Sequence, residues 1–374
     1  MKICFVSDAG SYHTKKWCKW FYEQGHEISV ISFTPGVIEN AEVIIIETGA
    51  NSRGNDLGKL KYFLAISKMR QAIQEINPDI INVHYATSYG TIVALSGIKG
   101  YVLSVWGADV YDFPQKSFMH RSLLKYSLNN AKYLFSTSQA MAVETKKYTS
   151  KEITVTPFGV DMNLFNPNKR KRAKDDNRFI IGTIKTLTPK YGIDYLIKAI
   201  SIVSQKRPDI PIELRIAGKG ENAEEYKMLA QSCNISHITK WLGYISQEEA
   251  ANEWANMDLA IVYSTLDSES FGVSAVEAEA CGCPVIISDI PGLMEATLPG
   301  ETSIVIKRKN ERLLADAIID LFDNKEFRTK LGEQGRTFVE QKYDVQKCFE
   351  NVEKIFEDIN AKNGLVSGSK RVKV

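Results

Sequence analysis

The chain has 374 residues, of which 44% are hydrophobic and 25% are charged, and its formal net charge at pH 7 is +2. This length suits two domains that each bury a core, and the nearly neutral charge argues against a dedicated nucleic-acid-binding protein. No apolar run approaches the roughly 18 residues of a membrane helix, and the N-terminus has no signal-peptide pattern. Six scattered cysteines disfavour a disulfide framework. We therefore expect a cytoplasmic protein.

The first half of the chain alternates apolar runs with segments of helical periodicity. This alternation predicts a parallel, doubly wound α/β sheet. The expected strands are 2–7, 28–33, 42–47, 79–84, 101–106, 132–137 and 153–156, and the expected helices lie near 13–25, 58–77, 88–97, 117–130 and 139–149.

A polar, charged break at residues 166–178 predicts a linker, so we expect one domain over 1–165 and a second over 179–344. The second half repeats the alternation. Its expected strands are 179–184, 212–217, 238–242, 259–263, 284–288 and 303–306, and its expected helices lie near 192–205, 222–233, 247–256, 271–281, 310–323 and 326–340. Residues 345–361 have apolar positions at helical spacing, and the polar tail 362–374 is expected to be disordered.

The most informative stretch is 268–285, which lies between two apolar runs that predict buried parallel strands. A short loop and a helix beginning near Ser270 are expected between them. Gly272 would let a ligand approach the backbone, and the N–H groups at the helix start would form an anion site. Glu269 and Glu277 bracket this anion site, which suits a sugar joined to a nucleotide diphosphate. The alternative is an ordinary strand–turn–helix with solvated carboxylates.

No Asp-x-Asp spacing that could hold a divalent metal on a diphosphate occurs in the chain. We therefore expect no metal and no cofactor, and expect protein cations and helix ends to neutralise a leaving diphosphate. Lys185 and Lys190 are the candidates, because they follow a predicted strand where an α/β sheet places ligands. The alternative is two surface lysines.

The run Glu269-Ser270-Phe271-Gly272, followed by Glu277-Ala278 and Gly282-Cys283-Pro284-Val285, resembles the Glu-x7-Glu signature of the retaining glycosyltransferases of family 4. Ser270 replaces the usual first Gly. The resemblance implies the GT-B fold, in which two Rossmann-like domains face a cleft and a C-terminal helix, here 345–361, crosses back to the first domain. It implies that Glu269 binds hydroxyls of the donor sugar and that Glu277 holds the ribose hydroxyls. The donor site would also take in Ser270 and the amides of Phe271, Gly272 and Val273.

Other segments resemble family landmarks, in order along the chain. Gly10 lies in a loop resembling the one that approaches the donor phosphates, Gly218 in a turn near the nucleotide, and Ile245 in a segment bordering the base. The resemblance implies that Lys185 and Lys190 contact the donor phosphates. Lys185 stands where Arg is usual and so forfeits bidentate geometry, and Tyr191 separates Lys190 from Gly192.

The acceptor residues are less explicit. His13 follows the first strand and either lies near the acceptor or caps the next helix, and His84 ends a strand on the ligand side, with a structural role as its alternative. Trp106 stands where family members carry a catalytic His, so it either packs against a sugar or belongs to the core. Asp109 is a candidate for binding acceptor hydroxyls. We count Lys185, Lys190, Glu269, Asp109 and His84 as candidate catalytic residues.

The resemblance implies a retaining enzyme that moves a hexose-type sugar from a nucleotide diphosphate, UDP preferred, to a saccharide or lipid-linked acceptor hydroxyl. A nucleotide-sugar epimerase and a non-catalytic nucleotide-sugar-binding partner are the alternatives. The mixture of bases and aromatic residues over Lys15–Phe21 could give weak peripheral contact with the inner face of the plasma membrane, or be a solvated helix face with its tryptophans in the core.

Overall fold

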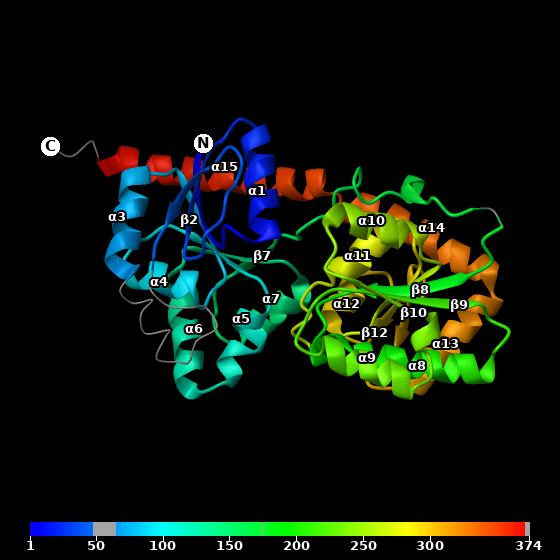
Figure 1. Cartoon of the computed structure of the whole chain (residues 1–374). Helices are drawn as coiled ribbons and strands as arrows, with labels where there is room; N and C mark the ends of the chain where they lie inside the picture. Colours follow the sequence, from blue (N-terminus) through cyan, green and yellow to red (C-terminus); the bar gives the residue numbers. More distant parts are fainter. Residues whose placement is uncertain (48–64, 174, 371–374) are drawn as a thin grey trace. The chain divides into compact units, whose positions relative to one another are not determined.

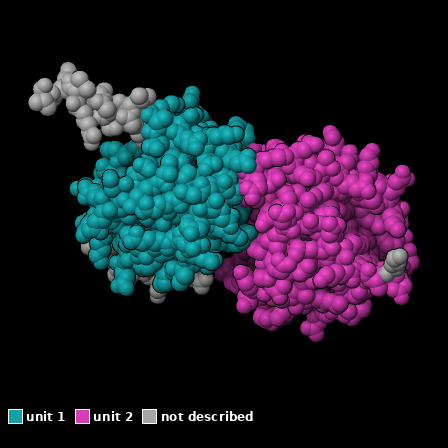
Figure 2. All heavy atoms as spheres, turned by 90° about the horizontal axis from the view of Figure 1, so that it is seen from above, with its two compact units in different colours: residues 1–157, 349–374 teal, residues 158–348 magenta. Residues whose placement is uncertain are grey.

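The computed structural model describes residues 1–47, 65–173 and 175–370 (Figure 1). The chain forms two compact units, coloured separately in Figure 2. The first comprises Met1–Pro157 and Phe349–Val374, and the second comprises Phe158–Cys348.

The first unit contains a seven-stranded parallel sheet in the order β3-β2-β1-β4-β5-β6-β7. Its strands are β1 (Lys2–Val6), β2 (Glu27–Ser32), β3 (Glu42–Ile45), β4 (Ile80–His84), β5 (Val102–Val105), β6 (Tyr133–Ser136) and β7 (Ile153–Val155). The helices of this unit are α1 (Tyr12–Glu23), α3 (Ile66–Ile76), α4 (Tyr89–Leu95), α5 (Ala108–Tyr111), α6 (Phe118–Asn130), α7 (Gln139–Lys146) and most of α15 (Val345–Lys370). The central strand β1 is apolar and buried from Ile3 to Val6, as a strand covered on both faces should be.

The second unit contains a six-stranded parallel sheet in the order β10-β9-β8-β11-β12-β13. Its strands are β8 (Phe179–Ile184), β9 (Ile212–Ala217), β10 (Thr239–Gly243), β11 (Leu259–Val262), β12 (Val285–Ser288) and β13 (Ser303–Ile306). Its helices are α8 (Ile193–Lys206), α9 (Ala223–Ser232), α10 (Gln247–Asn256), α11 (Val273–Ala280), α12 (Pro291–Ala296), α13 (Glu311–Asp323) and α14 (Lys325–Lys342). One core cluster joins residues of α8 and α13 to the strands, with Ile197, Leu214 and Ile318 fully buried.

All thirteen predicted strands are present, and the prediction of a doubly wound α/β fold is confirmed. The short helices α5 and α12 were not predicted, because four and six residues are too few to show helical periodicity. The helix expected over 58–77 is found as α3 from Ile66, and residues 48–64 lie outside the described part of the chain.

The C-terminal helix α15 returns to the first unit, as predicted. Its apolar positions pack on α1, where the ring of Phe349 lies 5.0 Å from that of Trp17 and the ring of Phe356 lies 5.5 Å from that of Phe21. The helix continues to Lys370, so the prediction of disorder from residue 362 onward is wrong up to that point. Polar composition alone does not end a helix, and no proline follows residue 361 to stop it.

The same packing decides between the two interpretations of the basic–aromatic cluster on α1. Trp17, Trp20 and Phe21 are all buried in the first unit, so none of them is available to enter a membrane interface. The bases of the cluster remain on the outer face, with Lys15 and Lys19 exposed. No helix in the described ranges is both long and apolar enough to cross a membrane.

The segment 166–178, predicted as a linker, lies within the second unit. Arg170 and Arg172 both bind the carboxylate of Asp258, and Arg170 also donates to the backbone oxygens of Ala255 and Met257. The first unit ends at Pro157 instead of residue 165. The charged composition that suggested a solvated linker is therefore used in ion pairs that fasten the segment to the sheet.

Candidate functional site

The candidate site in the second unit lies where the strand order reverses. The chain runs from β8 outward through β9 and β10, then returns to β11 on the other side of β8. In doubly wound sheets, ligands bind at the carboxyl ends of the strands on either side of such a reversal. Lys185 directly follows β8, and Ser264 and Glu269 follow β11.

An ion pair joins the two sides of this reversal. The amino group of Lys185 lies 3.1 Å from Oε2 of Glu269, and the two side chains are only 9% and 10% exposed. The hydroxyl of Ser264 also donates to Oε2 of Glu269, at 3.1 Å. Both charges are therefore held in a fixed place at the carboxyl edge of the sheet.

The pair sets the protonation state of both groups. Burial alone would lower the pKa of Lys185, but the carboxylates of Glu269 and Glu277 outweigh it and the pKa is raised. Burial alone would raise the pKa of Glu269, but Lys185 and Lys190 outweigh it and the pKa is lowered. The site therefore presents a fixed cation and a fixed anion at neutral pH.

Lys190 lies on the same side of the sheet. Its amino group donates to the backbone oxygen of Ser268 at 2.9 Å, and it lies 5.3 Å from the ring centre of Tyr191. The amino group of Lys185 lies 5.0 Å from the same ring centre. Tyr191, the residue that departs from the family pattern, thus contacts both lysines and keeps them at one place. The structure brings the two lysines together, and their contact with donor phosphates stays a prediction.

The start of α11 supplies backbone donors beside the ion pair. Gly272 precedes the helix with a φ of +80°, which a glycine adopts without strain, and a Cβ there would meet the side chain of Leu293 at 2.5 Å. Within the described chain, no acceptor takes the N–H groups of Phe271, Gly272 and Val273. The helix begins at Val273, later than expected, so Phe271 and Gly272 precede it and Val273 is its first residue. Backbone N–H groups at a helix start are donors of the kind that bind anions.

The other predicted donor residues are mostly buried around this turn. Ser270 and Phe271 are buried, and the ring of Phe271 lies 5.2 Å from that of Tyr343 and 6.4 Å from that of Phe158. Glu277 is 7% exposed on α11, close enough to Lys185 to raise its pKa. Phe271 therefore anchors the turn through its side chain and can offer a ligand only its backbone.

Gly218 supports the site from β9. Its φ is +137°, and a Cβ would lie 1.8 Å from the backbone oxygen of Lys185. Glycine is therefore required for the close approach of the two loops, whether or not a nucleotide lies nearby. Ile245 is half-buried two residues after β10, at the same carboxyl edge.

The first unit has its own polar cluster at its own reversal point, between β1 and β4. His84 ends β4, and its Nδ1 lies 3.1 Å from the hydroxyl of Ser7, which follows β1. The Ser7 hydroxyl is 2.7 Å from that of Thr14 on α1. Nε2 of His84 has no hydrogen-bond partner among the described residues, although the side chain is 1% exposed. A buried ring nitrogen without a partner is unusual and marks a candidate functional group.

Aromatic rings surround His84 and connect it with His13. The ring of Trp106 lies 4.5 Å from that of His84 and 5.9 Å from that of His13. Burial lowers the pKa of both histidines to about 3, so both are neutral at physiological pH. His13 lies inside α1 and does not cap it, since the N-cap is Ser11. Three of the predicted acceptor residues, His13, His84 and Trp106, are thus brought together.

Asp109 and Gly10 have local roles in the structure. The Asp109 carboxylate is fully buried and accepts hydrogen bonds from the backbone N–H groups of Ala86, Gly107 and Trp106. It fixes the loop after β5 and therefore the position of Trp106, and its burial leaves it no access to an acceptor hydroxyl. The N–H of the exposed Gly10 donates to Asp8 at 2.8 Å.

Sequence reasoning missed Ser7, Thr14 and Ser264, which hold His84 and Glu269 in place. Small hydroxyl residues next to strand ends are too common to be noticed in one sequence. The signal that was available is their position, since Ser7 is the last residue of the predicted strand 2–7 and Ser264 directly follows the predicted strand 259–263.

Comparison with known proteins agrees with the fold and the motif. The sequence model described as "Glycosyl transferases group 1" matches residues 165–338, and "Glycosyl transferase 4-like" matches residues 2–138. An uncharacterized glycosyltransferase of Methanocaldococcus jannaschii is 27% identical over 312 residues, covering 80% of this chain and 83% of that protein.

Two solved structures are similar over nearly the whole chain. Sucrose-phosphate synthase from Thermosynechococcus elongatus gives a TM-score of 0.82 at 19% identity, covering 97% of this chain and 100% of that one. Anabaena HepE in complex with UDP and glucose gives a TM-score of 0.79 at 19% identity, covering 96% of this chain and 99% of that one. The two family models together span most of the sequence, and the chain belongs to the group 1 glycosyltransferases, with the GT-B fold.

Proposed function

We propose that this glycosyltransferase moves a hexose-type sugar from UDP to an acceptor hydroxyl with retention of anomeric configuration. The observation that carries the proposal is the Lys185–Glu269 ion pair beside the three amides that start α11. A diphosphate needs cations and N–H donors, and a sugar needs a carboxylate that accepts from its hydroxyls. These groups lie together at the carboxyl edge of one sheet. HepE, which is similar in fold, is described in complex with UDP and glucose.

In the proposed reaction, charge develops on the diphosphate as the bond to the sugar breaks. Lys185, Lys190 and the amides of residues 271–273 stabilise that charge, and no metal is required. The acceptor hydroxyl attacks from the same face, and the departing phosphate takes its proton. Glu269 accepts hydrogen bonds from the sugar, because the adjacent lysines keep it ionised.

We further propose that the His84–Trp106 cluster contributes to acceptor binding. The indole offers an apolar face of the kind that packs against sugar rings, and Nε2 of His84 is a polar atom without a protein partner. The acceptor in this proposal is a saccharide or lipid-linked hydroxyl. Burial of Trp17 and Trp20 withdraws the aromatic anchors that favoured membrane contact, and the proposal places the enzyme in the cytoplasm.

Two measurements test the proposal. Calorimetry with UDP, GDP and ADP identifies the nucleotide, and we expect UDP to bind most tightly. Incubation with UDP-sugars and candidate acceptors should then release UDP and give a product whose anomeric configuration matches the donor, read by NMR coupling constants. A new sugar nucleotide formed without acceptor would show an epimerase. Binding without any turnover across the acceptor panel would favour a non-catalytic partner.

A further inference from the structure

The second unit contains a cavity of about 450 Å³ at the amino ends of its strands. Met257 and Asp258, which line it, directly precede β11, and Pro284 directly precedes β12. Lys185 and Glu269 follow the carboxyl ends of β8 and β11, so they lie at the other edge of the same sheet. The cavity is therefore separate from the proposed donor site, and the inference below does not depend on the proposed function.

The charged residues around the cavity are mainly basic. They are Arg170, Lys325, Arg328 and Arg336 as cations, and Asp258 and Glu333 as carboxylates. This lining has a formal excess of two positive charges. The volume is in the range of cavities that hold small metabolites.

Two of the arginines have no carboxylate partner among the described residues. Arg328 donates through Nη1 to the backbone oxygens of Leu321 and Phe322, and its guanidinium lies 4.9 Å from the ring centre of Phe179. Arg336 donates through Nη1 to the backbone oxygens of Phe165 and Ala280. These contacts hold the guanidinium groups in place without neutralising them. Burial also lowers the pKa of Arg328, and the nearby Asp258 only partly opposes this.

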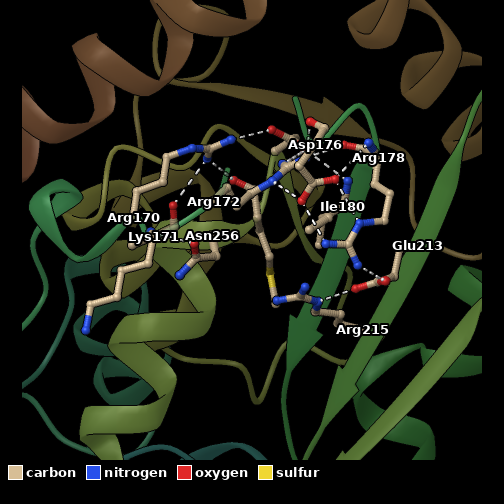
Figure 3. Close-up of polar contacts among 12 residues, drawn as sticks. Arg170, Lys171, Arg172, Asp176, Arg178, Ile180, Glu213, Arg215 and Asn256 are labelled. Atoms are coloured by element: carbon tan, nitrogen blue, oxygen red, sulfur yellow. Dashed lines mark hydrogen bonds and ion pairs between the residues drawn. The ribbon is translucent and has the colours of Figure 1, made fainter. Parts of the chain in front are cut away.

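The carboxylate of Asp258 already has partners within the protein. It binds Arg170 and Arg172 and also accepts the N–H of Ile180. Arg172 also pairs with Asp176. Arg178 pairs with both Asp176 and Glu213, which extends the network. Figure 3 shows Arg172, Asp176, Arg178 and Glu213 as neighbours in one network of polar contacts. The network holds Arg170 against Asp258. Arg328, Arg336 and the exposed Lys325 line the cavity outside this network, together with one carboxylate, Glu333.

We propose that this cavity binds a small phosphomonoester. A phosphate carries close to two negative charges at neutral pH and three acceptor oxygens, which match two immobilised guanidinium groups and the excess charge of the lining. Pro167, Met257 and Pro284 provide an apolar surface for the body of the molecule.

Calorimetry on the full chain tests this, with glucose 6-phosphate and inorganic phosphate as probes and glucose as the uncharged control. We expect saturable binding of glucose 6-phosphate, weaker binding of phosphate and none of glucose. Arg328→Gln should weaken binding at least about tenfold, because a charge-assisted contact is lost. Lys325→Glu reverses an exposed charge that makes no ion pair among the described residues, so it tests the site even if the Arg328 variant does not fold.

The matched control is Lys330→Ala, which removes an exposed cation of the same helix that does not line the cavity. It should change affinity by less than about twofold, since exposed charges contribute little. Lys190→Ala distinguishes the two edges of the sheet, because it removes a cation of the proposed donor site and leaves the Lys185–Glu269 ion pair in place, and phosphate binding at the cavity should survive it. Loss of binding in Lys190→Ala, equal weakening by Lys330→Ala and Lys325→Glu, or no saturable binding of either phosphate probe would each overturn the proposal.

Discussion

The amino group of Lys185 and the carboxylate of Glu269 lie 3.1 Å apart although 84 residues separate them in the chain. Each is nearly buried, and each shifts the other toward its charged form. Removing one partner of such a pair leaves an uncompensated buried charge, which typically costs about 3–5 kcal/mol of stability. The pair is therefore a structural element as well as the proposed binding element, and variants must be chosen to separate the two effects.

Glu269→Gln should lower turnover by roughly one to three orders of magnitude, about 1.4 kcal/mol per order, while leaving affinity for free UDP nearly unchanged. The glutamine loses the charge that accepts from the donor sugar, yet the diphosphate still meets Lys185 and replaces the missing anion. Calorimetry with UDP and initial rates with a UDP-sugar measure the two effects.

Glu277→Gln is the comparison for that variant, because it should lower the affinity for free UDP as well. The expected loss is that of a charge-assisted hydrogen bond, about 1.5–3 kcal/mol. If Glu269→Gln reduces UDP affinity as much as Glu277→Gln does, the assignment of sugar to one and ribose to the other is wrong.

Lys190→Ala should lower kcat by more than it raises KM, because charge on the diphosphate grows in the transition state. Lys190 is preferred to Lys185 for this test, since its amino group donates to the backbone oxygen of Ser268 and Glu269 keeps its ion pair with Lys185 when Lys190 is removed. Lys198→Ala, in a half-exposed pair with Asp194 on α8, is the control and should leave both parameters unchanged. If Lys190→Ala changes KM and leaves kcat unchanged, Lys190 binds the substrate and the transition state equally and does not stabilise the developing charge.

The sequence predicted the strands and the long helices well, because buried parallel strands are continuous apolar runs and amphipathic helices have a clear period. It also predicted the grouping of Lys185, Glu269 and the turn at Gly272, since all three follow strands that a doubly wound topology brings to one edge. It failed where a side chain has two plausible environments. Asp109 is polar and near a strand end, but only the folded loop shows that backbone N–H groups take up its carboxylate.

The prediction of a linker at the charged segment 166–178 failed for a related reason. Composition distinguishes a solvated run of bases from an ion-paired one only if the partners are known, and Asp258 lies more than 80 residues away. The exchange of His for Trp106 is visible in the sequence, but the packing of its ring against His84 is not.

Activity should survive chelation by EDTA. The proposed site neutralises the leaving diphosphate with Lys185, Lys190 and backbone amides, and it assigns no step to a divalent ion. Initial rates before and after EDTA, followed by addition of magnesium or manganese, measure this. Complete loss on chelation with recovery on adding metal would contradict the mechanism.

Acid should destabilise the first unit through its buried histidines. The pKa of His13 and of His84 is lowered from 6.5 to about 3, so the unfolded chain binds these protons first as the pH falls. The contribution of the neutral histidines to the free energy of unfolding is complete above pH 6.5 and is lost as the pH falls from 6.5 toward 3. His84→Gln should reduce the slope of stability against pH in this window, measured by urea unfolding at several pH values. An unchanged slope would show that His84 is not buried in its neutral form.

Glu279 should produce the opposite dependence in the second unit. It is fully buried on α11, and neither carboxyl oxygen has a hydrogen-bond partner among the described residues. Burial raises its pKa from 4.5 to about 8, and Thr302, which lies nearby without meeting hydrogen-bond geometry, offsets little of that rise. Between these values the folded chain holds a proton that the unfolded chain has released, so stability should fall as the pH rises from 4.5 to 8.

Glu279→Gln keeps the shape of the protonated acid and removes the titration. The variant should be more stable than the parent at pH 8 and nearly equal to it at pH 4.5, with a difference that grows by up to about 1.4 kcal/mol per pH unit. Hydrogen exchange of peptides from α11 and α14 measures this change in stability locally, because the side chain of Glu279 packs where Gly335 of α14 approaches. Glu301→Gln, at an exposed position of the same unit, should show no such gain. Equal stability of Glu279→Gln and the parent at both pH values would mean that Glu279 is ionised and solvated in the folded protein.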